Sequence, residues 1–194
     1  MILQPIIPFA HGLLEKAVTP GDVVVDATMG NGHDTLFFAK LVGENGQVFA
    51  FDIQAEALKN TEKRLEENEI PQERVKLIRE SHVCIGQSIP QALHSKIKAC
   101  IFNLGYLPGG DKSICTQGES SIQAVQNLLS ILPPGALIVL VLYPGHPEGQ
   151  VECEQVCAYL ATIPPDLAQV VQYQILNNDR RPPFVVAIER RGTV

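Results

Sequence analysis

Residues 23–35 carry the stretch that decides the fold, VVVDATMGNGHDT. Its three valines predict a short buried strand, and the glycines after them predict a tight turn into a helix. Gly30 and Gly32 let the backbone approach a ligand, because neither has a Cβ atom. Free N–H groups at the start of the following helix favour an anionic group such as a carboxylate. The same stretch also suits a plain strand-to-helix turn in which Asp34 or Thr35 caps the helix.

Apolar runs and amphipathic stretches alternate along the rest of the chain, which predicts a mostly parallel sheet covered by helices. The predicted strands cover residues 23–27, 47–51, 75–78, 99–104, 136–142, 170–176 and 184–189. The predicted helices cover residues 13–18, 34–41, 55–68, 120–132 and 150–161. Residues 177–183 are too few for a crossover helix, so the last two strands should form a hairpin with one strand antiparallel. A Rossmann-like α/β fold of seven strands that ends in such a hairpin resembles the class I methyltransferase fold.

Composition limits the function classes. The 194 residues suit one domain over 1–194, with residues 1–21 as a helical lead-in. The net charge of −6 has the wrong sign for bulk attraction to nucleic acid, so a polyanion must meet a local patch. The five cysteines contain no CxxC pair, which favours reduced thiols and no metal site. With no basic leader and no run of about 18 apolar residues, we expect a cytoplasmic protein without membrane contact.

An acidic residue closes the second predicted strand. Asp52 follows the apolar run 47–51, twenty positions after Gly32, and a carboxylate there can accept both hydroxyls of a ribose. The two elements together predict a nucleoside site but leave the cofactor open, because NAD enzymes share them. Two details favour a methyl donor over NAD: Thr35 replaces the third small residue of the dinucleotide fingerprint, and Asp26 places an acid at the strand end.

A third polar block, NLGYLPGGDK, occupies residues 103–112 after a central strand. Ligands bind at the carboxyl ends of strands in open α/β sheets. Asn103, followed by Gly105 and Tyr106, can hold an amine through side-chain and backbone oxygens. The alternative is a turn in which Asn103 bonds to its own backbone.

Five blocks together resemble a known family. They are DATMGNGHDT at 26–35, FDIQ at 51–54, FNLGYLPGGDK at 102–112, YPGHP at 143–147 and PPF at 182–184. In these blocks, and over about residues 13–190, the chain resembles the bacterial MnmM/YtqB family, long labelled rRNA methylases. The resemblance implies S-adenosylmethionine as the donor and N-methylation of 5-aminomethyl-(2-thio)uridine at wobble position 34 of tRNA. Thr28 stands where the general methyltransferase loop has its first glycine, and the family resembled here also carries threonine there.

The expected donor site combines the three elements. The residues expected to bind the donor are Asp26, Thr28, Gly30, Asn31, Gly32, Asp34, Thr35, Asp52, Ile53, Gln54, Ser81, His82, Asn103 and Leu104. Within this set, Asp52 should hold the ribose and Ile53 should lie against the adenine. An aliphatic amine must lose a proton before it attacks, so a nearby acceptor is expected. The catalytic candidates are Asn103, Tyr106 and His146, although His146 suits the role of a structural loop anchor equally well.

The expected RNA contacts lie on the loops that border this site. The substrate-binding candidates are Tyr106, Gly109, Lys112, His146, Arg180 and Arg181. The basic members also suit a solvated surface without RNA. The expected partner is the tRNA anticodon stem-loop, and spare Leu and Val residues on helix faces permit a homodimer. The alternatives are an rRNA or small-molecule methyltransferase with the same donor site, or a nucleoside-binding module without catalysis.

Overall fold

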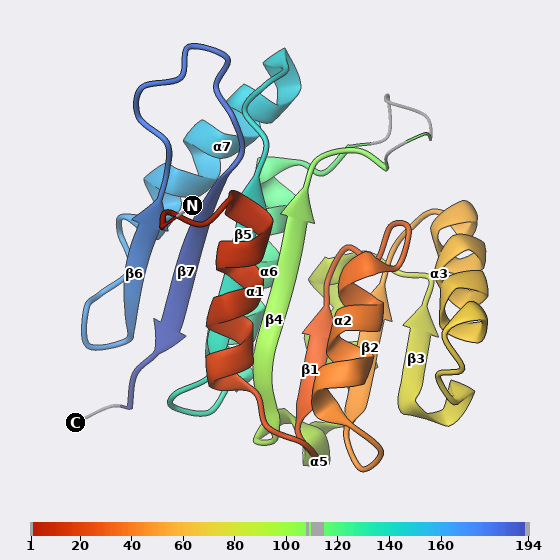
Figure 1. Cartoon of the computed structure of the whole chain (residues 1–194). Helices are drawn as coiled ribbons and strands as arrows, with labels where there is room; N and C mark the ends of the chain where they lie inside the picture. Colours follow the sequence, from red (N-terminus) through yellow and green to blue (C-terminus); the bar gives the residue numbers. More distant parts are fainter. Residues whose placement is uncertain (1, 108, 110–114, 193–194) are drawn as a thin grey trace.

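A seven-stranded sheet forms the middle layer of the protein in the computed structural model, which describes residues 2–107, 109 and 115–192 (Figure 1). The strands are β1 Val23–Asp26, β2 Gln47–Phe51, β3 Val75–Ile78, β4 Ile97–Leu104, β5 Leu137–Leu142, β6 Ala168–Tyr173 and β7 Phe184–Arg190. Their order is β3-β2-β1-β4-β5-β7-β6, and β7 runs antiparallel to both of its neighbours. The predicted seven strands and the terminal hairpin are therefore confirmed.

Helices cover both faces of this sheet (Figure 1). One face carries α1 Ile6–Ala17, α2 His33–Val42 and α3 Ala55–Glu67. The other face carries the 3-10 turn η2 His82–Cys84, the short helices α4 Ile85–Ser88 and α5 Gln91–His94, and the long helices α6 Gly118–Ile131 and α7 Pro147–Leu160. The turn η1 Gln72–Arg74 leads into β3. The helices predicted at 34–41, 55–68, 120–132 and 150–161 are present with small changes at their ends.

The central strands are apolar on both faces, as a parallel sheet between two helix layers requires. In β4, Cys100 and Phe102 pack toward α6, whereas Ala99 and Ile101 pack toward α1 and α2. All four side chains are fully buried. Burial on both faces explains why residues 99–102 are all apolar. It also makes the polar residue that follows them, Asn103, unusual in this strand.

Helix α1 is longer than the sequence predicted. The predicted helix covered residues 13–18, but Pro5 is the N-cap and Pro8 lies in the first turn of Ile6–Ala17. A proline is tolerated there because the first N–H groups of a helix have no intrahelical partner. Ala10 and Leu14 are fully buried against the sheet, and this packing stabilises the longer helix.

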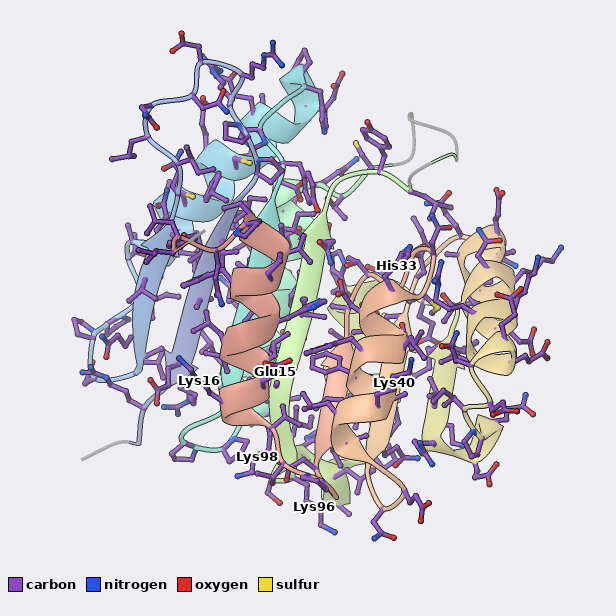
Figure 2. All side chains as sticks on the ribbon, in the orientation of Figure 1. Glu15, Lys16, His33, Lys40, Lys96 and Lys98 are labelled. Atoms are coloured by element: carbon purple, nitrogen blue, oxygen red, sulfur yellow. The ribbon has the colours of Figure 1, made fainter. Side chains whose placement is uncertain are left out.

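The carboxyl ends of β1, β2, β4 and β5 meet at one edge of the sheet, because these strands are parallel. Strand β6 ends at Tyr173, earlier than predicted, so residues 174–183 form the loop to β7 at this same edge. Figure 2 shows His33 at this edge, whereas Lys96 and Lys98 lie at the opposite one. Among the residues that the structure describes, no helix is long and apolar enough to span a membrane.

Candidate functional site

A cavity of about 960 Å³ opens at the carboxyl edge of the sheet. The residues expected from the sequence that line it are Thr28, Gly30, Asn31, Asp34, Asp52, Ile53, Gln54, Ser81, His82, Asn103, Tyr106, His146, Arg180 and Arg181. Asp26, Gly32, Thr35, Leu104 and Gly109 are not on its wall, and Lys112 lies outside the described residues. The structure thus brings most of the expected donor and acceptor residues into one space.

The loop from β1 to α2 needs glycine at two positions. Gly30 and Gly32 have φ values of 50° and 76°, in the left-handed region. A Cβ atom on Gly32 would lie 2.9 Å from the Cα atom of Thr61 in α3. Gly32 therefore permits close packing of the loop on α3, and Gly30 faces the cavity.

Asp26 supports this loop from behind. Its side chain is fully buried, Thr35 Oγ1 donates a hydrogen bond of 2.6 Å to Oδ2, and the Thr28 N–H donates one of 3.2 Å to Oδ1. Burial, followed by the nearby charge of Asp34, raises the pKa of Asp26 to about 7. Asp26 and Thr35 therefore shape the loop without reaching the cavity.

Asp52 and Ile53 form one wall of the cavity. The oxygens of Asp52 accept hydrogen bonds from the Gly30 N–H at 3.1 Å and from the Gln54 N–H at 2.9 Å. Burial raises the pKa of this carboxyl group, and the Ile53 N–H also hydrogen-bonds to it, which leaves room for a further donor. Ile53 is 53% exposed, which is unusual for a large apolar side chain. A fixed carboxylate beside an exposed apolar surface matches the ribose and ring of a nucleoside.

Ser81 and His82 close the next part of the wall, after β3. Ser81 caps η2 by accepting a hydrogen bond of 3.3 Å from the Val83 N–H. Burial lowers the pKa of His82 to about 4, so its imidazole is neutral at pH 7. Its Nε2 atom lies 3.3 Å from Ser120 Oγ. Ser81 and His82 therefore give this part of the wall uncharged polar groups, next to the carboxylate of Glu80.

Asn103 is held from three sides at the end of β4. Its backbone N–H donates a hydrogen bond of 2.7 Å to Thr28 Oγ1, and its side-chain Nδ2 donates to Asp34 Oδ2. The Tyr143 hydroxyl donates to Oδ1 at 3.1 Å. Because one end of the amide contacts a carboxylate and the other end contacts a hydroxyl, its orientation is fixed. Oδ1 keeps one lone pair for another donor.

Two members of this network were not expected from the sequence. His11 on α1 has its Nε2 atom 2.6 Å from Asp34 Oδ1, and its ring stacks on Phe37 with centroids 4.0 Å apart. Tyr143 follows β5 and contacts Asn103. Tyr143 begins the block YPGHP, so the family resemblance already contained a signal for it. His11 is the one histidine in the apolar run 6–14, and only the fold reveals its partner.

The rings of Tyr106 and His146 form a tilted pair on the cavity wall. Tyr106 bridges to Cys115 across the loop that follows β4, and its ring centroid lies 5.5 Å from that of His146. His146 caps α7, because its Nδ1 accepts a hydrogen bond of 3.0 Å from the Gly149 N–H. This contact is the one expected if His146 anchors the loop before α7. A catalytic role for His146 stays a prediction.

Positive charge at the cavity comes from the loop between β6 and β7. Arg180 and Arg181 are exposed and line the cavity. Arg181 has a φ of 49°, and its side chain donates a hydrogen bond to Gln150 on α7. Within the described ranges, no three His, Cys, Asp or Glu side chains are grouped to hold a metal ion.

The strand order, the antiparallel β7 and the cavity at the carboxyl edge define the Rossmann-like fold class of the methyltransferases. The chain belongs to the family described as "Putative rRNA methylase", whose model matches residues 48–189.

Comparison with individual proteins agrees with this family. The chain is 38% identical over 190 residues to "tRNA (mnm(5)s(2)U34)-methyltransferase, chloroplastic" of Arabidopsis thaliana, covering 94% of this chain and 69% of the relative. A crystal structure of an rRNA methylase from Clostridium thermocellum, also described as putative, has 40% identity and a TM-score of 0.92, covering 97% and 98% of the two chains. A methyltransferase of Streptococcus mutans, again described as putative and solved in complex with SAH, has 33% identity and a TM-score of 0.86, covering 97% and 99%.

Proposed function

We propose that this protein transfers the methyl group of S-adenosylmethionine to the amine of 5-aminomethyl-(2-thio)uridine at wobble position 34 of tRNA. The product is the 5-methylaminomethyl form. The observation that carries the proposal is the fixed amide of Asn103, whose Oδ1 keeps a lone pair for an amine N–H. The name of the Arabidopsis relative supports the tRNA substrate.

The described residues fit the donor. Asp52 can accept a further hydrogen bond, from a ribose hydroxyl, and Ile53 offers an apolar surface to the adenine. Gly30 and Asn31 border the space for the methionine part, and Asp34 adds a carboxylate that suits a cationic ligand. When bound, the donor supplies an electrophilic methyl group on a sulfonium. The Streptococcus relative, solved with SAH, supports this assignment.

Asn103 contributes by positioning. A hydrogen bond from the substrate amine to Oδ1 directs the nitrogen lone pair, and holding two reactants in line can supply much of the rate enhancement. Thr28, Asp34 and Tyr143 keep the amide from rotating. Catalysis then depends on groups that are already ordered before the substrate binds.

The acceptor side of the cavity suits a nucleotide. Tyr106 is 38% exposed and can stack on an unpaired base, and Arg180 and Arg181 can contact phosphates. His146 lines the same cavity, whereas a contact of Gly109 or Lys112 with the RNA stays a prediction from the sequence. We propose the tRNA anticodon stem-loop as the partner on this basis. Homodimer formation and a cytoplasmic location stay predictions, and the Arabidopsis relative is named as chloroplastic.

Methyl transfer to defined RNAs tests the proposal. Purified protein is incubated with S-adenosylmethionine and either aminomethylated tRNA, the same tRNA without the modification, or rRNA, and nucleosides are measured by mass spectrometry. We expect the 5-methylaminomethyl nucleoside only from aminomethylated tRNA. Methylation of rRNA alone would support the alternative substrate and contradict the proposal.

Two variants test the residue assignments. We expect Asp52→Ala to weaken donor binding by at least about tenfold in calorimetry, because the ribose hydroxyls lose a charged acceptor. Asn103→Ala should keep most of the donor affinity and lose nearly all turnover. Unchanged donor affinity in Asp52→Ala, or an active Asn103→Ala protein, would contradict the corresponding role.

A further inference from the structure

The proposed reaction requires a proton acceptor, and the sequence left its identity open. A primary aliphatic amine is mostly protonated at neutral pH and has no lone pair for attack until it loses a proton. Asn103 is an amide and cannot act as a base. The Nδ1 atom of His146 is occupied by the Gly149 N–H, and its Nε2 atom is buried. Burial, together with the charge of Asp34, raises the pKa of Tyr143, so this hydroxyl remains a donor.

His11 and Asp34 differ from these groups, because both are bases on the cavity wall next to Asn103. The Nε2 atom of His11 lies 2.6 Å from Oδ1 of Asp34, and Oδ2 of Asp34 accepts a hydrogen bond from Asn103. The side chains of His11 and Asp34 are 25% and 12% exposed, and both line the cavity. Because Oδ1 and Nδ2 belong to one small amide, a group that binds to Oδ1 lies one amide group away from Asp34, while His11 retains contact with solvent.

The position of His11 is built into the fold. Its ring stacks on Phe37 at an interplanar angle of 8°, with centroids 4.0 Å apart. Helix α1 holds the ring over the carboxyl edge because Ala10 and Leu14 anchor the helix in the core. A histidine with no role beyond the solvated surface would make neither the stacking contact with Phe37 nor the contact with Asp34. The two contacts therefore indicate that His11 is held in a defined position.

We infer that His11 and Asp34 form a pair that accepts the proton of the substrate ammonium group before methyl transfer. The inference deepens the proposed function and rests on it. One N–H bond of the ammonium breaks, its electron pair stays on nitrogen, and the proton moves to the pair. That electron pair then forms the N–C bond to the methyl group, and the C–S bond breaks with both electrons left on sulfur. His11 acts through Asp34 as a positioning residue and passes the proton on to solvent.

Other titratable and charged groups surround the pair and remain in every variant. They are Asp26 of β1, His33 of α2, Asp52 after β2, Glu80 after β3, Tyr106 and Cys115 of the loop after β4, Tyr143 and His146 after β5, and Arg180 and Arg181 of the loop between β6 and β7. A comparison of pH profiles between the wild-type protein and variants of His11 removes their shared contribution. The difference between the two pH profiles then measures the contribution of His11 and Asp34 to the rate.

The test measures single-turnover methylation of aminomethylated tRNA between about pH 6 and pH 9.5. In His11→Gln an amide N–H can still donate to Asp34, but the side chain cannot take up a proton. His11→Ala removes both properties. We expect both variants to react about 100-fold more slowly than the wild-type protein at pH 7. The deficit should shrink to about tenfold or less at pH 9.5, because more of the amine is then already unprotonated.

The controls separate this effect from misfolding. Donor affinity and the thermal midpoint of both variants should stay close to the wild-type values. His94→Gln should reproduce the wild-type profile, because His94 lies on α5, away from the cavity, and bonds to the carbonyl of Ile89. A deficit of His11→Ala that is equal at all pH values, or full activity of His11→Gln at pH 7, would overturn the inference. A wild-type protein that does not methylate this tRNA would instead overturn the proposed function.

Discussion

Asp26 lowers the stability of the free protein at alkaline pH. Its pKa is raised from 3.8 to about 7, so between these values the folded chain keeps a proton that the unfolded chain has released. Stability therefore falls as pH rises through this window. Asp26→Asn keeps a carbonyl oxygen for the Thr28 N–H and cannot ionise. We expect it to gain on the order of 2 kcal/mol over the wild-type protein between pH 4 and pH 8.

Thermal unfolding without the donor, measured at several pH values, checks this expectation. A gain of that size corresponds to about 5 °C at pH 8 for a chain of this length. The two proteins should unfold at similar temperatures near pH 4, where the carboxyl group is protonated in the folded state. Parallel curves across the whole range would show that Asp26 does not titrate in this window.

Thr28 stands where the general methyltransferase loop has a glycine, and the hydrogen bond of its hydroxyl group explains why threonine is useful there. Thr28 Oγ1 accepts the backbone N–H of Asn103, so this loop fixes the residue that is proposed to hold the amine. Thr28→Val keeps the shape but leaves that N–H without its partner, at a cost of about 1–3 kcal/mol. We expect kcat to fall about tenfold or more, whereas Thr28→Ser should restore it to within about threefold. Steady-state methyl transfer to tRNA measures both, and a fully active Thr28→Val would contradict this role.

The site residues that could be predicted from the sequence share one property. Each lies next to a local sequence pattern, such as an apolar run or a glycine turn. Asp52 and Asn103 end apolar runs, and Gly30 lies in a glycine turn. The contact between His11 and Asp34 joins positions 23 apart, and that between Tyr143 and Asn103 joins positions 40 apart. No local spacing encodes these pairs, because the sheet topology alone brings them together.

Among the elements, α7, α6 and the loop after β4 are joined by one buried carboxylate. Glu152 on α7 is 3% exposed and accepts hydrogen bonds from Thr116 Oγ1 at 2.7 Å and Ser121 Oγ at 2.8 Å. Thr116 ends the loop that carries Tyr106. Glu152→Ala leaves two hydroxyl groups without partners, so we expect a loss of about 2 kcal/mol in unfolding free energy. We also expect KM for tRNA to rise several-fold.

Denaturant unfolding and tRNA titrations test this anchor. Donor affinity should change little, because Glu152 does not line the cavity. Glu154→Ala is the matched control on the same helix, since Glu154 is exposed and contacts only Gln150 in the hydrogen bonds of the described residues. An unaltered KM for tRNA in a destabilised Glu152→Ala protein would limit this carboxylate to a structural role.

Elements with strong periodicity could be predicted, and those that depend on tertiary packing could not. Strands β1 and β2 lie where their apolar runs do, because burial on both faces leaves little choice of residue. Helix α1 was predicted too short because its prolines occupy helix-start positions that resemble breaks. The contacts of Ala10 and Leu14 with the sheet decide its length, and those contacts involve residues far along the chain.

At the scale of the whole molecule, the order of the strands could be predicted in part. The count of runs and the short connection after 170–176 indicated a parallel sheet with a terminal hairpin. The position of β7 between β5 and β6 follows from pairing across the sheet, which the run lengths do not encode. The topology in turn concentrates the polar loops at one edge, so the site can form from five separate blocks.

Charge on the whole molecule predicts how salt affects tRNA binding. The net charge of −6 repels RNA at long range, so attraction requires a local patch, and we expect the loop that carries Arg180 and Arg181 to supply it. Each phosphate contact with a single strand adds about −0.7 to the slope of log affinity against log salt. Replacing both arginines with glutamine should therefore reduce the magnitude of this slope by about 1.4.

The matched control changes charge equally at the opposite edge of the sheet. Lys96 and Lys98 lie there, away from the cavity (Figure 2). Replacing both with glutamine removes the same two charges, so it should increase the long-range repulsion slightly and leave the slope unchanged. Filter binding of tRNA at several salt concentrations distinguishes the pairs. Equal slopes for both double variants would mean that only net charge matters, and the arginines would then have no phosphate contacts.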